Sequence, residues 1–195
     1  GVLQPGNEIQ GTWKARLPDH LGSYTIELKR ARAAHLLNDA ARLAALSAAC
    51  SVAEAALPER EIHVAAYDGF LVLLEALETS DHWAEVYISW ELGLLRELGF
   101  GLDLSACAQT GETEGLAFVS PRTGRAVTAA AGAPYKERLL ALPGFLAGQT
   151  SEETAPQDLI DGLALTGFFV ERHVLAPHNI KIPPARTRFV ARFTQ

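Results

Sequence analysis

Cys107 lies in a stretch, LDLSACAQTGE (102–112), whose spacing matches half of a zinc knuckle. A knuckle carries two cysteines separated by two residues and followed by glycine, because two thiolates then reach one tetrahedral ion. Thr110 occupies the second ligand position, and the segment TGRAVTAAAG (123–132) offers no cysteine or histidine for a second pair. Structural zinc needs four nitrogen or sulfur ligands, so the sequence predicts no bound metal, and one interpretation of Cys107 is a vestigial ligand position of a metal site that was lost.

Two other roles are open to this cysteine: a catalytic thiol, or a small hydrophobic residue buried in a turn. A reactive thiol needs a base or a cation beside it, and residues 102–112 contain no histidine, lysine or arginine. The sequence also lacks a glycine-rich phosphate loop, a His-Glu-x-x-His helix and a Gly-x-Ser-x-Gly elbow. We therefore expect a protein that is not an enzyme and that has no cofactor.

Two pairs of titratable residues could still suggest chemistry. His173 and His178 are five residues apart with Pro177 between them, which is more typical of a helix end than of a metal site. Asp158 and Asp161 fit the first turns of a helix, where the macrodipole favours acids. The alternative for the aspartates is a metal-dependent nuclease or hydrolase, which would show turnover that depends on a divalent ion.

Basic residues are concentrated at the two ends of the chain. The net charge is −6, yet residues 1–32 hold five basic and three acidic residues, and residues 181–195 hold four basic residues and no acid. The segment between them holds 8 basic and 20 acidic residues. Such asymmetry predicts basic ends that could contact nucleic acid and an acidic body, or simply an unevenly charged solvated surface.

Length and composition suit one medium-sized domain with a small appendage. The chain has 195 residues, 48% of them hydrophobic, and no apolar run approaches the roughly 20 residues that span a bilayer. No basic-then-apolar leader is visible, and two distant cysteines fit no disulfide framework, so we expect a cytoplasmic protein without a membrane partner. The absence of Met and the start at Gly1 lead us to expect that the natural N-terminus is missing.

The elements that must position these residues follow from hydrophobic periodicity. NEIQGTWKARL (7–17) and GSYTIELKR (22–30) alternate with period 2 and flank the turn PDHLG, which predicts a hairpin with one apolar and one Thr/Lys/Arg face. Spacings of three and four predict helices from Asp39 to Leu57, with Cys50 on the apolar stripe, from Ile62 to Leu77, and from a Ser80 or Asp81 cap to Gly99. The stripe of the second comprises Val64, Tyr67, Leu71 and Leu74.

The second half is expected to add a small sheet and more helices. We predict short strands at 116–120 and 125–128, a short helix over APYKERLLAL (133–142), a longer helix over 156–175, and a final basic helix within PPARTRFVARF (183–193). The predicted architecture is part of a β-domain followed by a helical bundle that carries a small β insertion.

The motifs WELGLLRELG (90–99) and LSACAQTG (104–111) resemble the bacterial RecO family of recombination mediators and DNA-repair proteins. VLQPGNE (2–8) before the hairpin, FVSPRTGRAV (118–127) and IPPARTRF (182–189) extend the resemblance over nearly the whole chain, and the alphaproteobacterial branch is the most similar. The resemblance implies an α+β, mostly helical protein: residues 1–31 form the C-terminal part of an OB-fold whose earlier strands are absent, and residues 32–195 a helical domain. Residues 104–132 would be a degenerate zinc-ribbon-like insertion, held by packing of Leu116, Phe118 and Val127 instead of metal.

The resemblance also implies a function. Proteins of this family bind single- and double-stranded DNA, anneal complementary strands, associate with RecR, and help RecA to replace single-strand binding protein (SSB), whose acidic tail binds their helical domain. We therefore expect a non-enzymatic mediator of recombinational repair in the DNA-damage (SOS) response, cytoplasmic and nucleoid-associated. The alternative is a helical adaptor that docks RecR or the SSB tail and does not bind DNA itself.

The residues expected to act are those of the polar hairpin face, the basic segment after it and the basic C-terminus. The predicted DNA contacts are Lys14, Arg16, Lys29, Arg30, Arg32, Arg186, Arg188 and Arg192. Trp13 and Tyr24 would lie in the OB core or serve as stacking platforms. An apolar groove with a basic rim would take the SSB tail, with Trp90 and Leu94 as walls and Arg96 on the rim.

Overall fold

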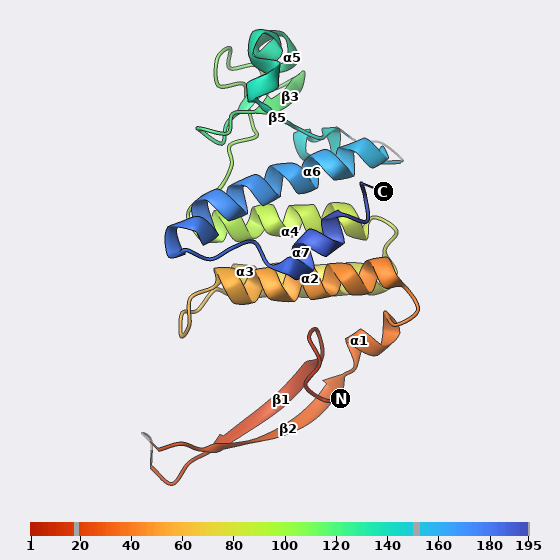
Figure 1. Ribbon diagram of the computed structural model, residues 1–195, viewed down its shortest axis with the longest axis vertical. Helices are drawn as coiled ribbons and strands as arrows, with labels where there is room; N and C mark the ends of the chain where they lie inside the picture. The colour runs from red at the N-terminus through yellow and green to blue at the C-terminus, as the bar shows by residue number, and fades with distance from the viewer. Residues whose placement is uncertain (18–19, 150–152, 195) are drawn as a thin grey trace.

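The computed structural model describes residues 1–17, 20–149 and 153–194. A hairpin, a helical body and a small sheet subdomain follow one another along the longest axis of the molecule, with the hairpin and the subdomain at opposite ends (Figure 1). This arrangement confirms the predicted α+β class with helices in the majority of the ordered elements. The described part of the chain contains no closed barrel, and none of its helices is long and apolar enough to cross a membrane.

The hairpin has the predicted strands. β1 (Glu8–Lys14) pairs with β2 (Ser23–Arg30) in antiparallel fashion, with a register shift between Glu8 and Ile9. The alternation of apolar and polar side chains is present, but the apolar face is not covered, because Ile9 and Leu28 are each about two-fifths exposed. The hairpin contacts the helices at its base, where the Asn7 side chain accepts a hydrogen bond from the Ala33 backbone N–H at 3.3 Å.

The helical body forms around a core that the predicted stripes supply. Asp39 caps its first long helix by accepting hydrogen bonds from the backbone N–H groups of Ala41 and Arg42, each at 3.0 Å, as the sequence predicts. The helices are α1 (Arg32–His35), α2 (Ala40–Ala56), α3 (Val64–Thr79), α4 (Trp83–Glu97), α6 (Pro156–Phe169) and α7 (Pro184–Val190). Two further segments, η3 (Val170–Leu175, π-helical) and η4 (Ala176–His178, 3-10), continue α6.

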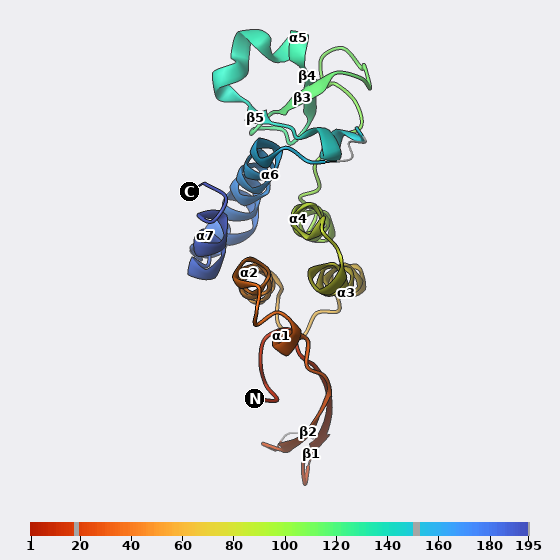
Figure 2. The same ribbon diagram turned by 90° about the vertical axis from the view of Figure 1, so that its right-hand side faces the viewer.

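These helices pack in two layers. α3 and α4 lie side by side on one flank, α2 and α7 on the other, and α6 packs on α4 (Figure 2). Ala45, Ala48 and Ala49 of α2 are fully buried, and such small side chains let neighbouring helix backbones approach closely. The C-terminal helix therefore closes the bundle against a helix far away in the sequence.

The subdomain is a three-stranded antiparallel sheet in the order β4-β3-β5. Its strands are β3 (Leu116–Val119), β4 (Ala126–Thr128) and β5 (Leu140–Ala141), and short helical segments α5 (Ala129–Gly132), η1 (Ala133–Arg138) and η2 (Gly144–Ala147) surround them. The helix predicted over 133–142 is wrong in its second half, because Leu140 and Ala141 pair with Val119 and Phe118 and extend the sheet. Tertiary pairing overrides the local helical pattern here.

Candidate nucleic-acid interface

The hairpin ends in an exposed aromatic pair with basic residues beside it, which we call the hairpin tip: Trp13, Lys14, Arg16 and Tyr24. Trp13 and Tyr24 are direct cross-strand partners and are 45% and 68% exposed. The indole lies over Gly22, where an added Cβ would come within 2.4 Å of its Nε1, so glycine is needed there. Lys14 and Arg16 are exposed and have no carboxylate partner among the described residues.

Lys29 lies on the same polar face as Lys14 but toward the base of the hairpin. Lys14 is opposite Ser23, six residues before Lys29 on β2, so roughly 20 Å of strand separates the two lysines. The Lys29 ammonium is 3.4 Å from the Glu27 carboxylate, and both side chains are largely exposed. Lys29 can therefore contact a ligand, but it is too far from the hairpin tip to contact the same part of that ligand.

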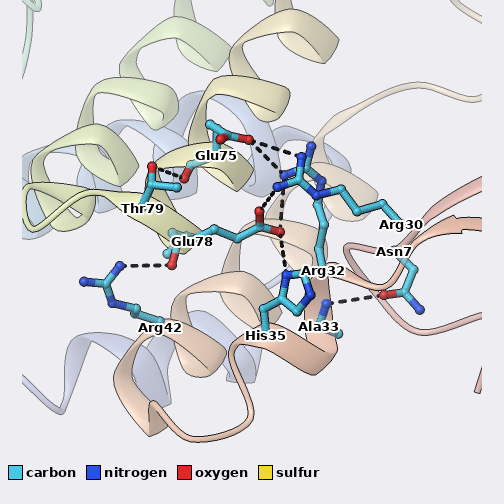
Figure 3. A network of polar contacts seen from close by, with 10 residues as sticks. Asn7, Arg30, Arg32, Ala33, His35, Arg42, Glu75, Glu78 and Thr79 are labelled. Carbon is cyan, nitrogen blue, oxygen red and sulfur yellow. Dashed lines mark hydrogen bonds and ion pairs between the residues drawn. The ribbon is translucent and has the colours of Figure 1, made fainter.

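The basic residues at the end of β2 and just after it turn inward and form an arginine–glutamate network with two glutamates of α3: Arg30, Arg32, His35, Glu75 and Glu78 (Figure 3). The Arg32 guanidinium lies 3.4 Å from the Glu75 carboxylate and 3.3 Å from that of Glu78. Arg30 contacts the same two carboxylates, and the His35 Nδ1 is 3.8 Å from Glu78. The network joins the end of the hairpin to α3.

This network corrects part of the predicted DNA site. Arg32 is 7% exposed and is surrounded by carboxylates, so the prediction that it contacts DNA is wrong. Arg30 keeps some exposure, but both of its terminal nitrogens face glutamates. Sequence reasoning missed the two partners because they lie more than 40 residues away on another helix.

Arg186 also proves to be structural. It is 5% exposed and holds Glu91 through two hydrogen bonds, from Nε at 2.7 Å and from Nη2 at 2.8 Å. Tyr87 donates to the same carboxylate at 2.9 Å, and Thr166 donates to its other oxygen. Burial raises the pKa of the Tyr87 hydroxyl, and the neighbouring Glu91 carboxylate raises it further. The predicted DNA contact of Arg186 is therefore wrong, and the residue instead joins α7 to α4 and α6.

Arg188 and Arg192 do remain on the surface. Both side chains are exposed and have no carboxylate partner in the described ranges. The backbone that carries them is held by packing of the neighbouring residues Phe189 and Phe193 against the Trp83 ring, with ring centroids 6.2 Å apart in each case. Arg188 on α7 and Arg192, two residues after its end, thus present two uncompensated cations on a packed aromatic support.

Trp90 and Leu94 line a groove, as predicted, but the groove does not have the predicted rim. This α3–α4 groove has a volume of about 380 Å³, and Leu57, Tyr67 and Phe70 complete its apolar wall. Glu61 and His63 are among its lining residues, and Arg96 is not. The prediction of a basic rim formed by Arg96 is therefore wrong. Tyr67, placed on a buried stripe by its spacing, is 62% exposed at this groove.

Cys107 is buried at the start of a turn, which the hydrogen bond from the Gly111 backbone N–H to the Cys107 carbonyl closes at 2.9 Å. Its sulfur accepts a hydrogen bond from the Thr128 backbone N–H at 3.4 Å and lies 3.7 Å from the Thr128 hydroxyl oxygen. Desolvation raises the pKa of this thiol, but hydrogen bonds from Thr110 and from the backbone N–H groups of Thr128, Gln109 and Thr110 outweigh it and lower the pKa to about 6. Leu116 and Val127 are buried beside it. Residues 1–17, 20–149 and 153–194 contain no group of three or more His, Cys, Asp or Glu that could hold a metal ion.

Comparison of the sequence with known proteins identifies the family of this chain. The family model described as "Recombination protein O C terminal" matches residues 37–181. A protein of Rhodospirillum centenum named DNA repair protein RecO is 54% identical over 98% of this chain and 76% of its own length. Proteins of the same name from Rhodospirillum rubrum and Phenylobacterium zucineum are 53% and 49% identical, over 98% and 99% of the chain and 78% and 79% of their own lengths. The chain therefore belongs to the RecO family.

Proposed function

We propose that this protein acts in DNA repair by binding single-stranded DNA at the hairpin tip. The relatives are named for a role in DNA repair, which supports the broad assignment. The observation that carries the assignment to single-stranded DNA is the exposed Trp13–Tyr24 pair at the end of the hairpin, with two uncompensated cations, Lys14 and Arg16, on the opposite face of the same narrow strand end. Bases stack on exposed aromatic rings, and phosphates pair with lysine and arginine without regard to sequence.

The proposal gives each group a defined task. Trp13 and Tyr24 hold unpaired bases by stacking on one face of the hairpin, and the backbone of the strand crosses the edge of the hairpin to Lys14, Arg16 and Lys29 on the other face. Arg188 on α7 and Arg192 just after it offer a further phosphate contact. Bases stacked in this way keep their pairing edges exposed, so the strand is available for annealing to a complementary strand. Transfer of that strand to RecA with the help of RecR follows from the family resemblance. Duplex DNA would bind through the same phosphate contacts but without stacking.

We also infer that the hairpin is part of an OB-fold. The exposed apolar residues Ile9 and Leu28, which pair nearer the base of the hairpin than Trp13 and Tyr24, support this, because a two-stranded hairpin with uncovered apolar residues is marginally stable alone. In the same way, we infer a zinc-ribbon ancestry for the subdomain from the knuckle-like turn at Cys107.

The test is single-stranded DNA binding by the full chain across a salt series. Wild-type protein should bind a labelled oligothymidylate with a steep salt slope. Changing Lys14 and Arg16 to Ala together should lower the magnitude of that slope by about 1.4, since each phosphate contact to a single strand contributes about 0.7. Changing Trp13 to Ala should weaken single-strand binding about tenfold and leave the salt slope unchanged.

A matched control is available on the subdomain. Lys136 and Arg138 are exposed and lie on η1, so their double alanine variant removes the same charge from a surface outside the hairpin. The proposal is wrong if this control lowers the slope as much as the hairpin variant does, or if the wild-type chain fails to bind at low salt.

A second candidate function is protein docking, and the α3–α4 groove favours it. Tyr67, Phe70 and Trp90 give the groove an aromatic lining of the kind that anchors partner segments. The SSB tail remains the partner that the family resemblance implies, although an acidic tail would meet Glu61 at this rim. Binding of a synthetic SSB-tail peptide that Tyr67→Ala abolishes would support the docking function, and the same variant should leave single-strand binding intact.

A further inference from the structure

Three rings form a stack where α4 joins the subdomain. His173 lies between Phe100 and Phe169, with ring centroids 5.6 Å from each and interplanar angles of 30° and 13°. Phe169 is buried at the inner end, and Phe100 is 41% exposed at the outer end. Phe100 follows Gly99, whose φ of +85° ends the helix, so the ring is held at the surface by a defined turn.

Phe100 and His173 form a wall shared by two hollows. The smaller hollow, about 180 Å³, is also lined by Leu102, Arg122 and Gly124. The larger one, about 510 Å³, is also lined by Arg172 and by residues at the end of α2. Because His173 covers one face of the Phe100 ring and Phe100 is 41% exposed, the other face of this ring is the surface on which a flat ring can stack.

Uncompensated arginines surround the wall. Arg96, Arg122 and Arg172 are exposed, and none has a carboxylate partner among the described residues. Arg96 lies against Gly101, where an added Cβ would come within 3.2 Å of its Cγ, and Arg172 lies over the Phe168 ring at 5.6 Å. Two carboxylates, Glu61 and Glu97, line the larger hollow and lie 3.6 and 3.4 Å from the His63 ring, so the phosphate contacts are expected on the side of the smaller hollow, where Asp103 is paired with Arg125 at 3.2 Å.

We propose that this junction patch, formed by Arg96, Phe100, Arg122, Arg172 and His173, is a second binding site for single-stranded DNA. An unpaired base stacks on the Phe100 ring, and the three arginines contact the phosphates on either side. The inference rests on the proposed function for its ligand, but it uses a surface separated from the hairpin by the helical body (Figures 1 and 2). The chain could therefore hold two segments of a strand at once.

The experiment combines affinity with localisation on the full chain. A labelled oligothymidylate and its duplex are titrated against wild type, Phe100→Ala, Phe100→Trp, Arg122→Glu and the control Lys136→Glu, which lies outside both hollows. Phe100→Ala should weaken single-strand binding about tenfold and duplex binding by less than about twofold, because paired bases cannot stack on the ring. Phe100→Trp should bind both ligands like wild type. Arg122→Glu should weaken the binding of both the single strand and the duplex, and Lys136→Glu should change the binding of neither.

Photocrosslinking then locates the strand. Trypsin cuts after Arg96 and Arg122, so a bromodeoxyuridine-containing strand bound at the patch should crosslink to the peptide 97–122. If Phe100→Ala fails to fold, Arg122→Glu at an exposed position and the crosslink still decide the matter. The inference is overturned if the peptide 97–122 carries no crosslink and both Phe100→Ala and Arg122→Glu bind single-stranded DNA normally. If Lys14→Ala/Arg16→Ala loses binding in that case, the hairpin proposal still stands. Crosslinking at 97–122 that survives the hairpin variant supports the patch and refutes the hairpin as the sole site.

Discussion

Glu91 shows how one residue can carry a structural task that its neighbours in sequence do not reveal. Its side chain is fully buried, and its two oxygens accept hydrogen bonds from Arg186, Tyr87 and Thr166. These donors come from α7, α4 and α6, so one carboxylate connects three helices. A buried ion pair contributes little net stability compared with apolar residues, but removing one partner leaves an isolated charge inside the protein.

Replacing Glu91 by Gln should therefore lower the free energy of unfolding by about 3–5 kcal/mol, measured by urea denaturation. The exposed substitution Arg188→Ala should change it by less than about 0.5 kcal/mol. The double variant Glu91→Leu/Arg186→Met should recover much of the loss, because no charge is then left unpaired. A double variant as unstable as Glu91→Gln would show that packing, not the stranded charge, is responsible.

The two cysteines should ionise in different pH ranges. The pKa of Cys107 is lowered to about 6 by the hydrogen bonds that outweigh its desolvation, whereas desolvation raises the pKa of Cys50 to about 11. The Cys107 thiolate therefore contributes stability that is fully present above its ordinary pKa of 9.0 and is lost as the pH falls through about 6. Ultraviolet thiolate absorbance should titrate near pH 6 in wild type and in Cys50→Ala. Persistence of that titration in Cys107→Ala would contradict the assignment.

At the scale of elements, the hairpin depends on its base for its position. Its own apolar face is uncovered, and the arginine–glutamate network is its main polar attachment to α3. Glu78 is central because its largely buried side chain faces Arg30, Arg32 and His35 together. The hairpin is thus held in place by charge more than by packing.

Changing Glu78 to Gln should loosen the hairpin selectively. Amides of β2 should exchange with solvent about 30-fold faster, which corresponds to about 2 kcal/mol for hydrogen bonds to a charged group, while α4 amides keep their protection. Glu59→Gln is a suitable control, since Glu59 is exposed and outside the network. Equal acceleration in α4 would mean that the substitution destabilises the whole body rather than the attachment.

The elements also show what a sequence can predict. The hairpin, the Asp39 cap and the three helices of the first half follow from local spacing, and the structure confirms them within a few residues. Arg32 and Arg186 could not be predicted correctly, because their partners lie about 40 and 95 residues away and a basic residue at a strand or helix end has the same local pattern whether it is buried or exposed. Phe100 was missed because a single aromatic residue between glycines has no periodicity to detect.

At the scale of the whole molecule, uncompensated cations are found at separate surfaces on an acidic body. The segment 33–180 carries 12 more acids than bases, and such a surface repels a phosphate backbone. Binding must therefore be concentrated at the few sites where exposed arginines and lysines lack partners, and the proposed ones are the hairpin tip, the junction patch, and Arg188 with Arg192. Two linked weak contacts on one strand raise the overall affinity.

The affinity for oligothymidylate should accordingly rise in a step once the strand is long enough to reach from the hairpin tip to α7. In the variant Arg188→Ala/Arg192→Ala the short strands should bind as before and the step should disappear. Fluorescence anisotropy over a length series at fixed salt measures this directly. A smooth rise that is identical in both proteins would show that α7 takes no part.

The closure of the bundle by α7 has a consequence for how the protein is made. Glu91 is synthesised about 95 residues before the arginine that neutralises it, and α2 is completed long before the helix that covers its alanine face. A nascent chain that has emerged only as far as α6 therefore exposes the Glu91 carboxylate and the alanine face of α2. Both must stay in contact with water or be bound by a chaperone. Cooperative folding of the helical body has to wait for residues 184–190, so premature termination before them should yield a chain that is degraded rather than one that is partly active.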